Sequence, residues 1–211
     1  MERGKIIVLE GNSNTGKTTL AKNLEQKGFV YIPGVRQFGI ENGLEIPDIP
    51  KNEDEEYENQ IALFAIERKR MERALEIARS GKNVVLDRSY LAIIAVAHAL
   101  DEKGTCMGAY ANSMRVYLGF MKRLAKDGLL PDKYLFLTAG VEELQRRNKT
   151  RSHVLSDTWM EKGMLDSQEE FFTKYRNKYP KKASVVETDG KSPEEITEEV
   201  LRILGINERE R

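Results

Sequence analysis

Gly11-Asn12-Ser13-Asn14-Thr15-Gly16-Lys17-Thr18 fits the pattern G-x-x-x-x-G-K-[ST] of a phosphate-binding loop. Residues 5–10, just before it, form a short apolar, β-branched run that predicts a buried strand. Residues 18–27, just after it, predict a helix with one apolar face. When a strand, a glycine-rich loop and a helix follow one another in this way, the backbone N–H groups of the loop and the helix N-terminus point at a bound phosphate. The alternative is an ordinary glycine-rich turn between a strand and a helix.

The loop residues suit the binding of a nucleoside triphosphate. The Lys17 ammonium can reach the β- and γ-phosphates, and the Thr18 hydroxyl can bind Mg²⁺. ATP and Mg²⁺ are therefore the predicted cofactors, and the predicted ATP-binding residues are Gly11, Asn12, Ser13, Asn14, Thr15, Gly16, Lys17, Thr18 and Thr19. The loop contains no arginine, so an arginine that stabilises the transferring phosphoryl group must come from another segment.

The composition predicts one domain over residues 1–211, and its 34 basic and 34 acidic residues give a net charge of zero. Such a balance argues against a broad basic surface for nucleic acid or an anionic membrane. Cys106 is the single cysteine, so we expect no intrachain disulfide and a cytoplasmic location. We expect no signal peptide, and the longest apolar run, residues 90–100, is too short to cross a membrane as a helix.

Strand patterns alternate with helical patterns along the chain. Four further strands are predicted at residues 29–32, 83–86, 133–137 and 185–186. This alternation predicts an α/β fold of the three-layer P-loop NTPase type, in which helices flank a five-stranded parallel sheet with the first strand central. Residues 33–52 are predicted to be irregular because of their glycines and prolines. The capping box at residues 192–195 predicts the start of the last helix, and the tail 207–211 is expected to fray.

Charged residues follow two of the predicted strands, at the edge where open parallel sheets bind ligands. Arg36 follows the second strand and is a candidate phosphate ligand or a solvated loop arginine. Asp87 ends the third strand, where it can hold Mg²⁺ or cap the next helix. Ser89 could serve as that cap instead, which would leave Asp87 for the metal. Arg88 can neutralise phosphate charge.

A long helix is predicted over residues 53–80, with Arg68 in the middle of its apolar seam of Tyr57, Ile61, Phe64, Met71, Leu75 and Ala78. A buried arginine needs a partner, because burying an unpaired charge is costly. Arg68 should therefore pair with an acid, or meet a ligand in a cavity that Phe64 also lines. The third alternative is a seam that drifts to the surface, where Arg68 extends its charge into solvent.

Residues 90–100 are apolar around most of the helix circumference, which predicts a position in the core or in a subunit interface. A homodimer is compatible with the second alternative. His98 is predicted to be a histidine at the edge of the core rather than a base.

A basic helix is predicted to begin near Val141 and to carry Arg147 and Arg151 on one face. Two guanidiniums on one face suit the phosphates of a nucleotide during transfer, or they complement the helix dipole. Residues 152–162 are predicted to be polar and irregular, as in a mobile lid. We predict a small lid at about residues 141–165.

With these elements in order, nearly the whole chain resembles the thymidylate kinase-like branch of the P-loop nucleoside and nucleotide kinases. The resemblance rests on residues 9–18, 63–68, 84–89, 131–137 and 188–196. It implies that Phe64 stacks on the acceptor base, that Arg68 faces the base edge, and that Arg88 binds the acceptor phosphate. It also implies that residues 188–196 pass near the adenine.

The chain departs from thymidylate kinases in two places. Those kinases usually have Arg-Glu-Pro-Gly after the second strand, where this chain has Tyr31-Ile32-Pro33-Gly34 and Arg36 two residues later. Their Ser-rich, Tyr-Gln stretch, which helps to read thymine, is replaced here by the apolar residues 92–97. Glu10-Gly11-Asn12, Asp87-Arg88-Ser89 and the spacing of Arg147 and Arg151 look closer to deoxynucleoside kinases.

The chemistry of the acceptor favours a monophosphate. A kinase that phosphorylates a hydroxyl needs a base, which relatives place just after the second strand. The first acid in that part of this chain is Glu41. A monophosphate is already anionic and needs cations rather than a base, and Lys17, Arg36 and Arg88 fit that need.

The sequence therefore predicts an ATP-dependent nucleoside monophosphate kinase of nucleotide biosynthesis, with a (deoxy)nucleotide such as dTMP as acceptor. In this prediction Lys17, Asp87, Arg88, Arg147 and Arg151 are catalytic, Thr18 and Asp87 hold Mg²⁺, and Arg36, Phe64, Arg68 and Arg88 bind the acceptor. One alternative is a kinase for a deoxynucleoside or another small hydroxyl compound, including one with a modified base. An alternative of another class is a nucleotide-binding switch or accessory ATPase, in which the lid arginines contact a protein partner.

Overall fold

The computed structural model describes residues 3–48, 50–151 and 154–206. Its sheet is parallel throughout, with the strand order β2-β3-β1-β4-β5. The strands are β1 (Ile6–Glu10), β2 (Val30–Ile32), β3 (Val84–Asp87), β4 (Lys133–Thr138) and β5 (Ala183–Glu187). The predicted fold class, with the phosphate-loop strand at the centre, is confirmed.

The strands alternate their side chains between two hydrophobic clusters, one on each face of the sheet. Ile6 and Val8 of β1 pack with residues of helices α3, α4, α5 and α8, whereas Ile7 and Leu9 pack with residues of α1 and α9. Every residue of β1 is fully buried. The sequence of such a strand is a continuous apolar run, because helices cover both faces of a parallel sheet.

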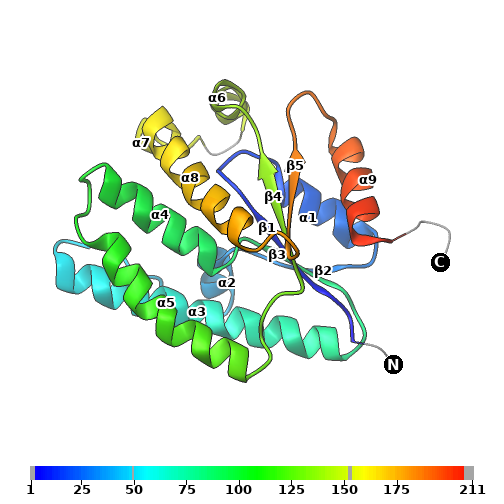
Figure 1. The fold of residues 1–211 in the computed structure, drawn as a ribbon, viewed down its shortest axis with the longest axis horizontal. Coiled ribbons are helices and arrows are strands. Elements are labelled where there is room, and N and C mark those ends of the chain that lie inside the picture. Colours follow the sequence, from blue (N-terminus) through cyan, green and yellow to red (C-terminus); the bar gives the residue numbers. More distant parts are fainter. Residues whose placement is uncertain (1–2, 49, 152–153, 207–211) are drawn as a thin grey trace.

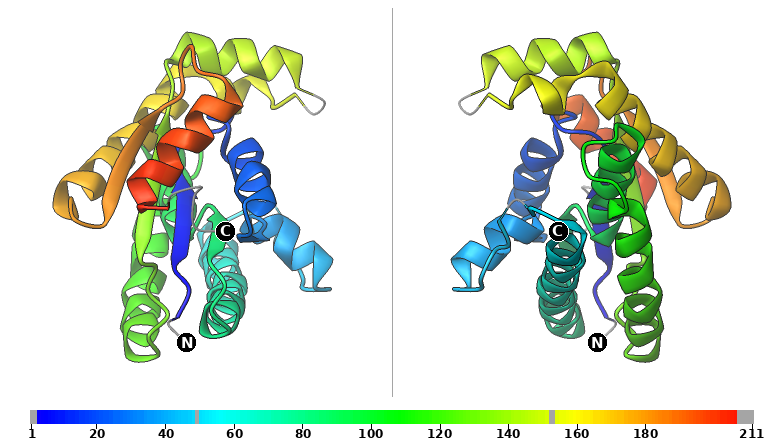
Figure 2. Two further views of the ribbon diagram at one scale, coloured as in Figure 1. Left: turned by 90° about the vertical axis from the view of Figure 1, so that its right-hand side faces the viewer. Right: turned by 90° about the vertical axis from the view of Figure 1, so that its left-hand side faces the viewer.

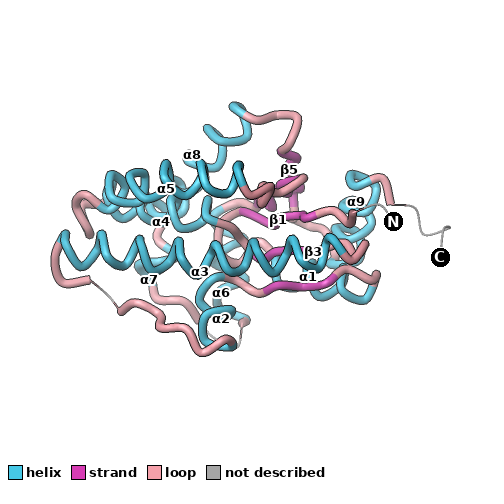
Figure 3. The backbone as a smooth tube through the Cα atoms, turned by 90° about the horizontal axis from the view of Figure 1, so that it is seen from below, coloured by secondary structure: helices cyan, strands magenta, loops and turns pink. Residues whose placement is uncertain are grey.

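The helices form the outer two layers of the molecule (Figure 1). Their bounds are α1 (Lys17–Gln26), α2 (Val35–Glu41), α3 (Glu53–Arg79), α4 (Tyr90–Glu102), α5 (Ala109–Lys126), α6 (Val141–Thr150), α7 (Asp157–Met160), α8 (Lys162–Lys178) and α9 (Pro193–Leu204). Edge-on views show α6 lying across the top of the sheet, over the end from which α1 begins (Figure 2). Seen from below, α3 and α5 extend well past the strands (Figure 3).

The prediction of an irregular stretch over residues 33–52 is wrong in part, because α2 covers Val35–Glu41. Phe38 of α2 packs into the core. Gly39 lies within α2 rather than in a turn, and a Cβ there would come within 2.3 Å of Cδ1 of Ile46. A contact of this kind is invisible to a pattern that counts glycine as a loop residue.

Two smaller expectations also need correction. Ile61, predicted to lie in the apolar seam of α3, is 47% exposed. Residues 152–162 are not wholly irregular, since Asp157–Met160 form α7 and Lys162 begins α8. Residues 152 and 153 and the tail 207–211 lie outside the described residues.

The long apolar helix α4 is buried in the core, the first of the two positions predicted for it. It packs between α5 and α8 on one face of the sheet. His98 is almost buried, and its ring packs against Tyr110 and Phe171, as expected for a histidine at the edge of the core. Within the described residues, none of the helices is long and apolar enough to span a bilayer.

Candidate active site

The loop between β1 and α1 depends on two glycines with left-handed backbone conformations. Gly11 has a φ of 124°, and a Cβ there would lie 2.1 Å from the backbone oxygen of Leu137. Gly16 has a φ of 91° at the N-cap of α1. Both conformations are easily reached by glycine and strained for residues with a side chain. The loop therefore curls tightly against β4 and leaves the first N–H groups of α1 free for an anion.

Lys17 lies inside this loop. It is 5% exposed, and its Nζ donates to the backbone oxygens of Gly11 at 3.1 Å and Asn12 at 2.5 Å and to Oγ1 of Thr15 at 3.0 Å. Burial lowers the pKa of the Lys17 ammonium to about 7, and the Arg88 guanidinium adds to this effect. Asp87 and Glu10 oppose this shift, but among the described residues Lys17 forms no salt bridge, so a bound phosphate would supply a direct counter-ion.

Thr18 and Asp87 meet at the mouth of the loop. The Thr18 hydroxyl donates to Oδ2 of Asp87 at 2.8 Å, although the two residues come from α1 and the end of β3. A hydroxyl and a carboxylate are hard oxygen ligands of the kind that Mg²⁺ prefers when substrate phosphates complete its shell. The described residues contain no group of three or more His, Cys, Asp or Glu side chains that could hold a metal alone. The pair therefore fits a metal that arrives with a nucleotide.

Asp87 is followed by a turn with an unusual backbone. Arg88 has a φ of 66°, one of two non-glycine residues with positive φ in the described part of the chain. Its Nη2 lies 3.2 Å from Oγ of Ser13, so the guanidinium reaches the phosphate loop. Ser89 is the N-cap of α4 and accepts from the amide of Leu91 at 3.2 Å. Ser89 therefore caps the helix, and the Asp87 carboxylate faces Thr18 instead.

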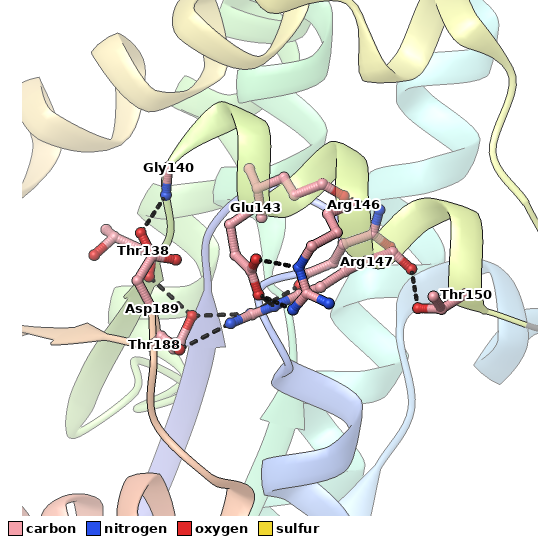
Figure 4. Close-up of polar contacts among 10 residues, drawn as sticks. Thr138, Gly140, Glu143, Arg146, Arg147, Thr150, Thr188 and Asp189 are labelled. Carbon is pink, nitrogen blue, oxygen red and sulfur yellow. Dashed lines mark hydrogen bonds and ion pairs between the residues drawn. The ribbon is translucent and has the colours of Figure 1, made fainter.

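The predicted lid arginines lie above the loop, on and just after α6. Figure 4 shows Glu143, Arg146 and Arg147 projecting from α6 toward Thr188. Arg147 donates to the backbone oxygen of Asn14 at 3.2 Å and to Oγ1 and O of Thr188 at 3.1 and 2.8 Å. The guanidiniums of Arg146 and Arg147 lower the pKa of the Glu143 carboxyl to about 2. Arg147 therefore joins the phosphate loop to the loop before α9.

Arg151, the second predicted lid arginine, caps the C-terminal end of α6. Its Nη1 donates to Oδ1 of Asn14 at 2.7 Å. Nδ2 of the same asparagine donates to the backbone oxygen of Leu144 at 3.2 Å. The phosphate loop is therefore tied to α6 by side chains from both segments.

These groups line one cavity of about 930 Å³. Its walls come from the phosphate loop, the end of β3, α6 and the loop before α9. The lining residues are Ser13, Asn14, Gly16, Lys17, Thr18, Thr19, Leu20, Asp87, Arg88, Glu143, Arg146, Arg147, Arg151, Leu155, Gly190, Lys191, Ser192, Pro193 and Ile196. The cavity is rich in cations, so it suits a polyanionic ligand that extends from the phosphate loop toward residues 190–193.

The chain matches a known protein family. The model of a family described as an AAA domain matches residues 6–162, which include the phosphate loop, Asp87 and α6. The chain belongs to this AAA domain family.

Two curated relatives of the chain are thymidylate kinases. A thymidylate kinase of Clostridium novyi is 25% identical over 162 residues, which is 71% of this chain and 74% of the relative. A thymidylate kinase of Nautilia profundicola is 29% identical over 152 residues, 70% of each chain. The resemblance noted in the sequence is thus confirmed, and the chain is a phosphotransferase of the thymidylate kinase-like branch.

Solved structures share the fold of this AAA domain protein. Thymidylate kinase from Candida albicans superposes with a TM-score of 0.69 at 20% identity, covering 96% of this chain and 92% of that one. Deoxyadenosine kinase from M. mycoides, solved with bound dATP, gives 0.67 at 17% identity, covering 95% and 99%.

Three of the four residues predicted to bind the acceptor lie away from the cavity of this phosphotransferase. Arg36 is exposed on α2. Phe64 is 2% exposed and packs edge-on against Phe120 at 5.0 Å. Arg68 pairs with Glu72 at 2.8 Å and with Asp127 at 3.0 Å, and its side chain is 36% exposed, so it combines the acid-pairing and the surface alternatives. Only Arg88 of that set lines the cavity.

Glu10, at the end of β1, is a residue whose position in the site the sequence did not reveal. It is fully buried, and its Oε1 accepts from the amide and the hydroxyl of Ser89 at 2.8 and 2.5 Å. Its Oε2 has no hydrogen-bond partner among the described residues. Burial raises the pKa of the Glu10 carboxyl to about 7, although Ser89, Arg88 and Lys17 each lower it. An acid that closes an otherwise apolar strand is the signal that could have found it.

The buried Glu10 carboxyl makes stability depend on pH. A raised pKa in the folded state means that its contribution to stability is fully present below its ordinary pKa of 4.5 and is lost as pH rises toward 7. Between about pH 5 and pH 8, the wild type should therefore lose stability relative to Glu10→Gln, by as much as about 3 kcal/mol. Urea unfolding across this range measures the difference. Glu25→Gln, at an exposed position on α1, is the control, and a constant difference for Glu10→Gln would contradict the buried titration.

Proposed function

We propose that this phosphotransferase moves the terminal phosphoryl group of ATP, bound with Mg²⁺, to the phosphate of a (deoxy)nucleoside monophosphate such as dTMP. The observation that carries the proposal is that one cavity is lined by Lys17, by Asp87 beside the Thr18 hydroxyl, and by Arg88. The first two groups suit the donor phosphates and their metal. Arg88, at the same edge of the sheet, suits a second phosphate that accepts the transferred group.

Each residue has a positional or electrostatic task. Lys17 and the loop amides hold the β- and γ-phosphates, while Thr18 and Asp87 hold Mg²⁺, which when bound neutralises phosphate charge. Arg88 holds the acceptor phosphate near the γ-phosphorus. An oxygen of the acceptor phosphate forms a new bond to the γ-phosphorus. The bond between the γ-phosphorus and the oxygen that bridges it to the β-phosphate breaks, and ADP leaves with the electron pair of that bond. No proton needs to be removed from an ionised monophosphate, so positioning and charge neutralisation suffice.

We further propose that residues 141–165 act as a lid on the donor site. Arg147 and Arg151 extend from α6 toward the phosphate loop, and both contact Asn14. Asn148 of α6 also holds the segment before α7, exchanging hydrogen bonds of 3.0 Å with the backbone of Leu155. The lid would supply the arginine charge that the phosphate loop lacks. The contact between Arg147 of the lid and Thr188 would then close the donor site on the side of residues 188–193.

The absence of a base beside the second strand favours a phosphate over a hydroxyl acceptor. Glu41, the first acid past β2, is exposed on α2 and accepts from Nε2 of Gln37 at 2.7 Å. It lines a different cavity of about 510 Å³, together with Tyr31 and Lys69. A base must come within hydrogen-bond reach of the proton that it removes. Glu41 and the Thr18–Asp87 pair lie in different cavities, which argues against that role.

A panel of acceptors tests the proposed function. ADP release should rise above the ATP-only rate with at least one nucleoside monophosphate, in a Mg²⁺-dependent manner, and mass spectrometry should find the diphosphate. The variant Glu41→Gln should keep kcat within about twofold, because no proton transfer is asked of it. Stimulation by nucleosides alone, with a large loss in Glu41→Gln, would support the alternative of a hydroxyl acceptor. Slow hydrolysis without any phosphorylated product would contradict both.

A further inference from the structure

The core of the molecule contains a charged pair to which the proposed reaction gives no task. Glu67 and Arg70 lie one turn apart on α3, form a salt bridge, and are both fully buried. Burial raises the pKa of the Glu67 carboxyl, which the Arg70 charge partly offsets. A buried ion pair is weak evidence for stability, since apolar residues of similar size often serve as well. Its presence here calls for another reason.

The remaining contacts of Arg70 supply that reason. Its Nε donates to the backbone oxygen of Pro33 at 2.9 Å, and its Nη2 lies 3.1 and 3.3 Å from those of Asp87 and Arg88. These carbonyls follow β2 and end β3, where backbone groups leave the sheet ladder. Guanidinium has N–H groups in a fixed planar fork, so one side chain can hold several carbonyls in one geometry.

The turn that Arg70 holds is the one with the strained backbone. Arg88 adopts a φ of 66°, which a residue with a side chain keeps only where its surroundings impose it. On the far side of the turn, Glu10 accepts from the amide of Ser89 at 2.8 Å. Two buried charged side chains from different elements therefore fix the turn before and after Arg88. The result is a guanidinium that points at Ser13 of the phosphate loop.

We propose that Arg70 is a positioning residue, which holds the Asp87–Arg88 turn so that the Arg88 guanidinium faces the phosphates. The proposal rests on the proposed function for the role of that side chain. Arg70 itself touches neither ligand nor reacting atoms, because it is fully buried beneath the turn. Glu67 keeps the Arg70 fork in place from within the same helix.

A double-mutant cycle separates positioning from general support of the fold. Arg70→Met should lower kcat about 100-fold, since a misplacement of about 1 Å can cost that much. In an Arg88→Met background the same change should lower kcat less than about threefold, because the group that Arg70 positions is already gone. Glu67→Met/Arg70→Met replaces the whole pair by apolar side chains and keeps the test valid if the single variant folds poorly. Additive losses in the two backgrounds would overturn the proposal.

The matched control is another ion pair at the same spacing on the same helix. Arg73 and Glu76 have side chains that are 60% and 65% exposed, and Arg73→Met/Glu76→Met should leave kcat within about twofold. Binding of ADP, measured by calorimetry, separates this proposal from the proposed function. If the wild type phosphorylates no acceptor, the proposed function fails. The same cycle in ADP affinity then decides the role of Arg70, with non-additive losses supporting it and additive losses overturning it.

Discussion

Replacing Lys17 by methionine should lower kcat/KM at least about a thousandfold and weaken ATP binding, with little change in fold. The ammonium is 5% exposed and its three hydrogen-bond acceptors all belong to the phosphate loop. A phosphate bound by this loop would lie close to the Lys17 charge. Because the surroundings exclude most water, the attraction between the two charges would be strong. Methionine keeps the length of the side chain and removes only the charge and the donors. Steady-state ADP release and calorimetric titration with ATP measure the two effects.

The matched control for this variant is Lys22→Met on the exposed face of the same helix. It removes an equal charge from α1 without touching the cavity, and it should leave kcat/KM within about twofold. Burial disfavours the charged form of Lys17 and lowers its pKa. Lys17→Met should therefore unfold at a urea concentration no lower than that of the wild type. Unchanged phosphoryl transfer in Lys17→Met would contradict the assignment of the loop as the donor site.

Replacing Asp87 by asparagine should lower kcat about 100-fold or more and raise the Mg²⁺ concentration needed for half-maximal activity. Asp87 is 8% exposed and its Oδ2 is 2.8 Å from the Thr18 hydroxyl, so the carboxylate is fixed where a phosphate-bound metal would sit. Asparagine keeps the hydrogen bond from Thr18 but removes the negative charge. Activity measured across a Mg²⁺ titration at constant ATP tests this expectation.

The control for the metal experiment is Asp166→Asn, on the exposed part of α8, where the carboxylate pairs only with Lys162 among the described residues. That variant should follow the wild-type Mg²⁺ curve. An Asp87→Asn variant with lower kcat and the same half-maximal Mg²⁺ concentration would indicate that Asp87 acts on the turn rather than on the metal.

The proposed donor half of the site is built from local features, which is why the sequence could point to it. The phosphate loop is eight consecutive residues, and Asp87 follows a strand whose apolar run is visible without any partner. Arg147 and Arg151 were singled out by their four-residue spacing, although α6 ends at Thr150 and Arg151 follows it in an extended conformation. Each of these features is set by a period, a cap or a motif within one segment.

The acceptor half was harder to predict because it depends on contacts between distant segments. A hydrophobic pattern singled out Arg68 as the unusual arginine of α3, whereas the structure buries Arg70, two positions later. The pattern counts only side-chain polarity. It cannot record that carbonyls at Pro33, Asp87 and Arg88 converge on one point and make a buried guanidinium favourable.

The sequence by itself determined a parallel sheet with a nucleotide-binding loop after its central strand, since alternating apolar periods, glycines and caps dictate both locally. The tertiary structure decided which charges work together. Glu10 comes from β1, Arg70 from α3 and Arg88 from the end of β3, and only the packed sheet brings them to one turn. The physical reason is that a buried charge is tolerated only where the fold supplies its partners, and those partners are far apart in the chain.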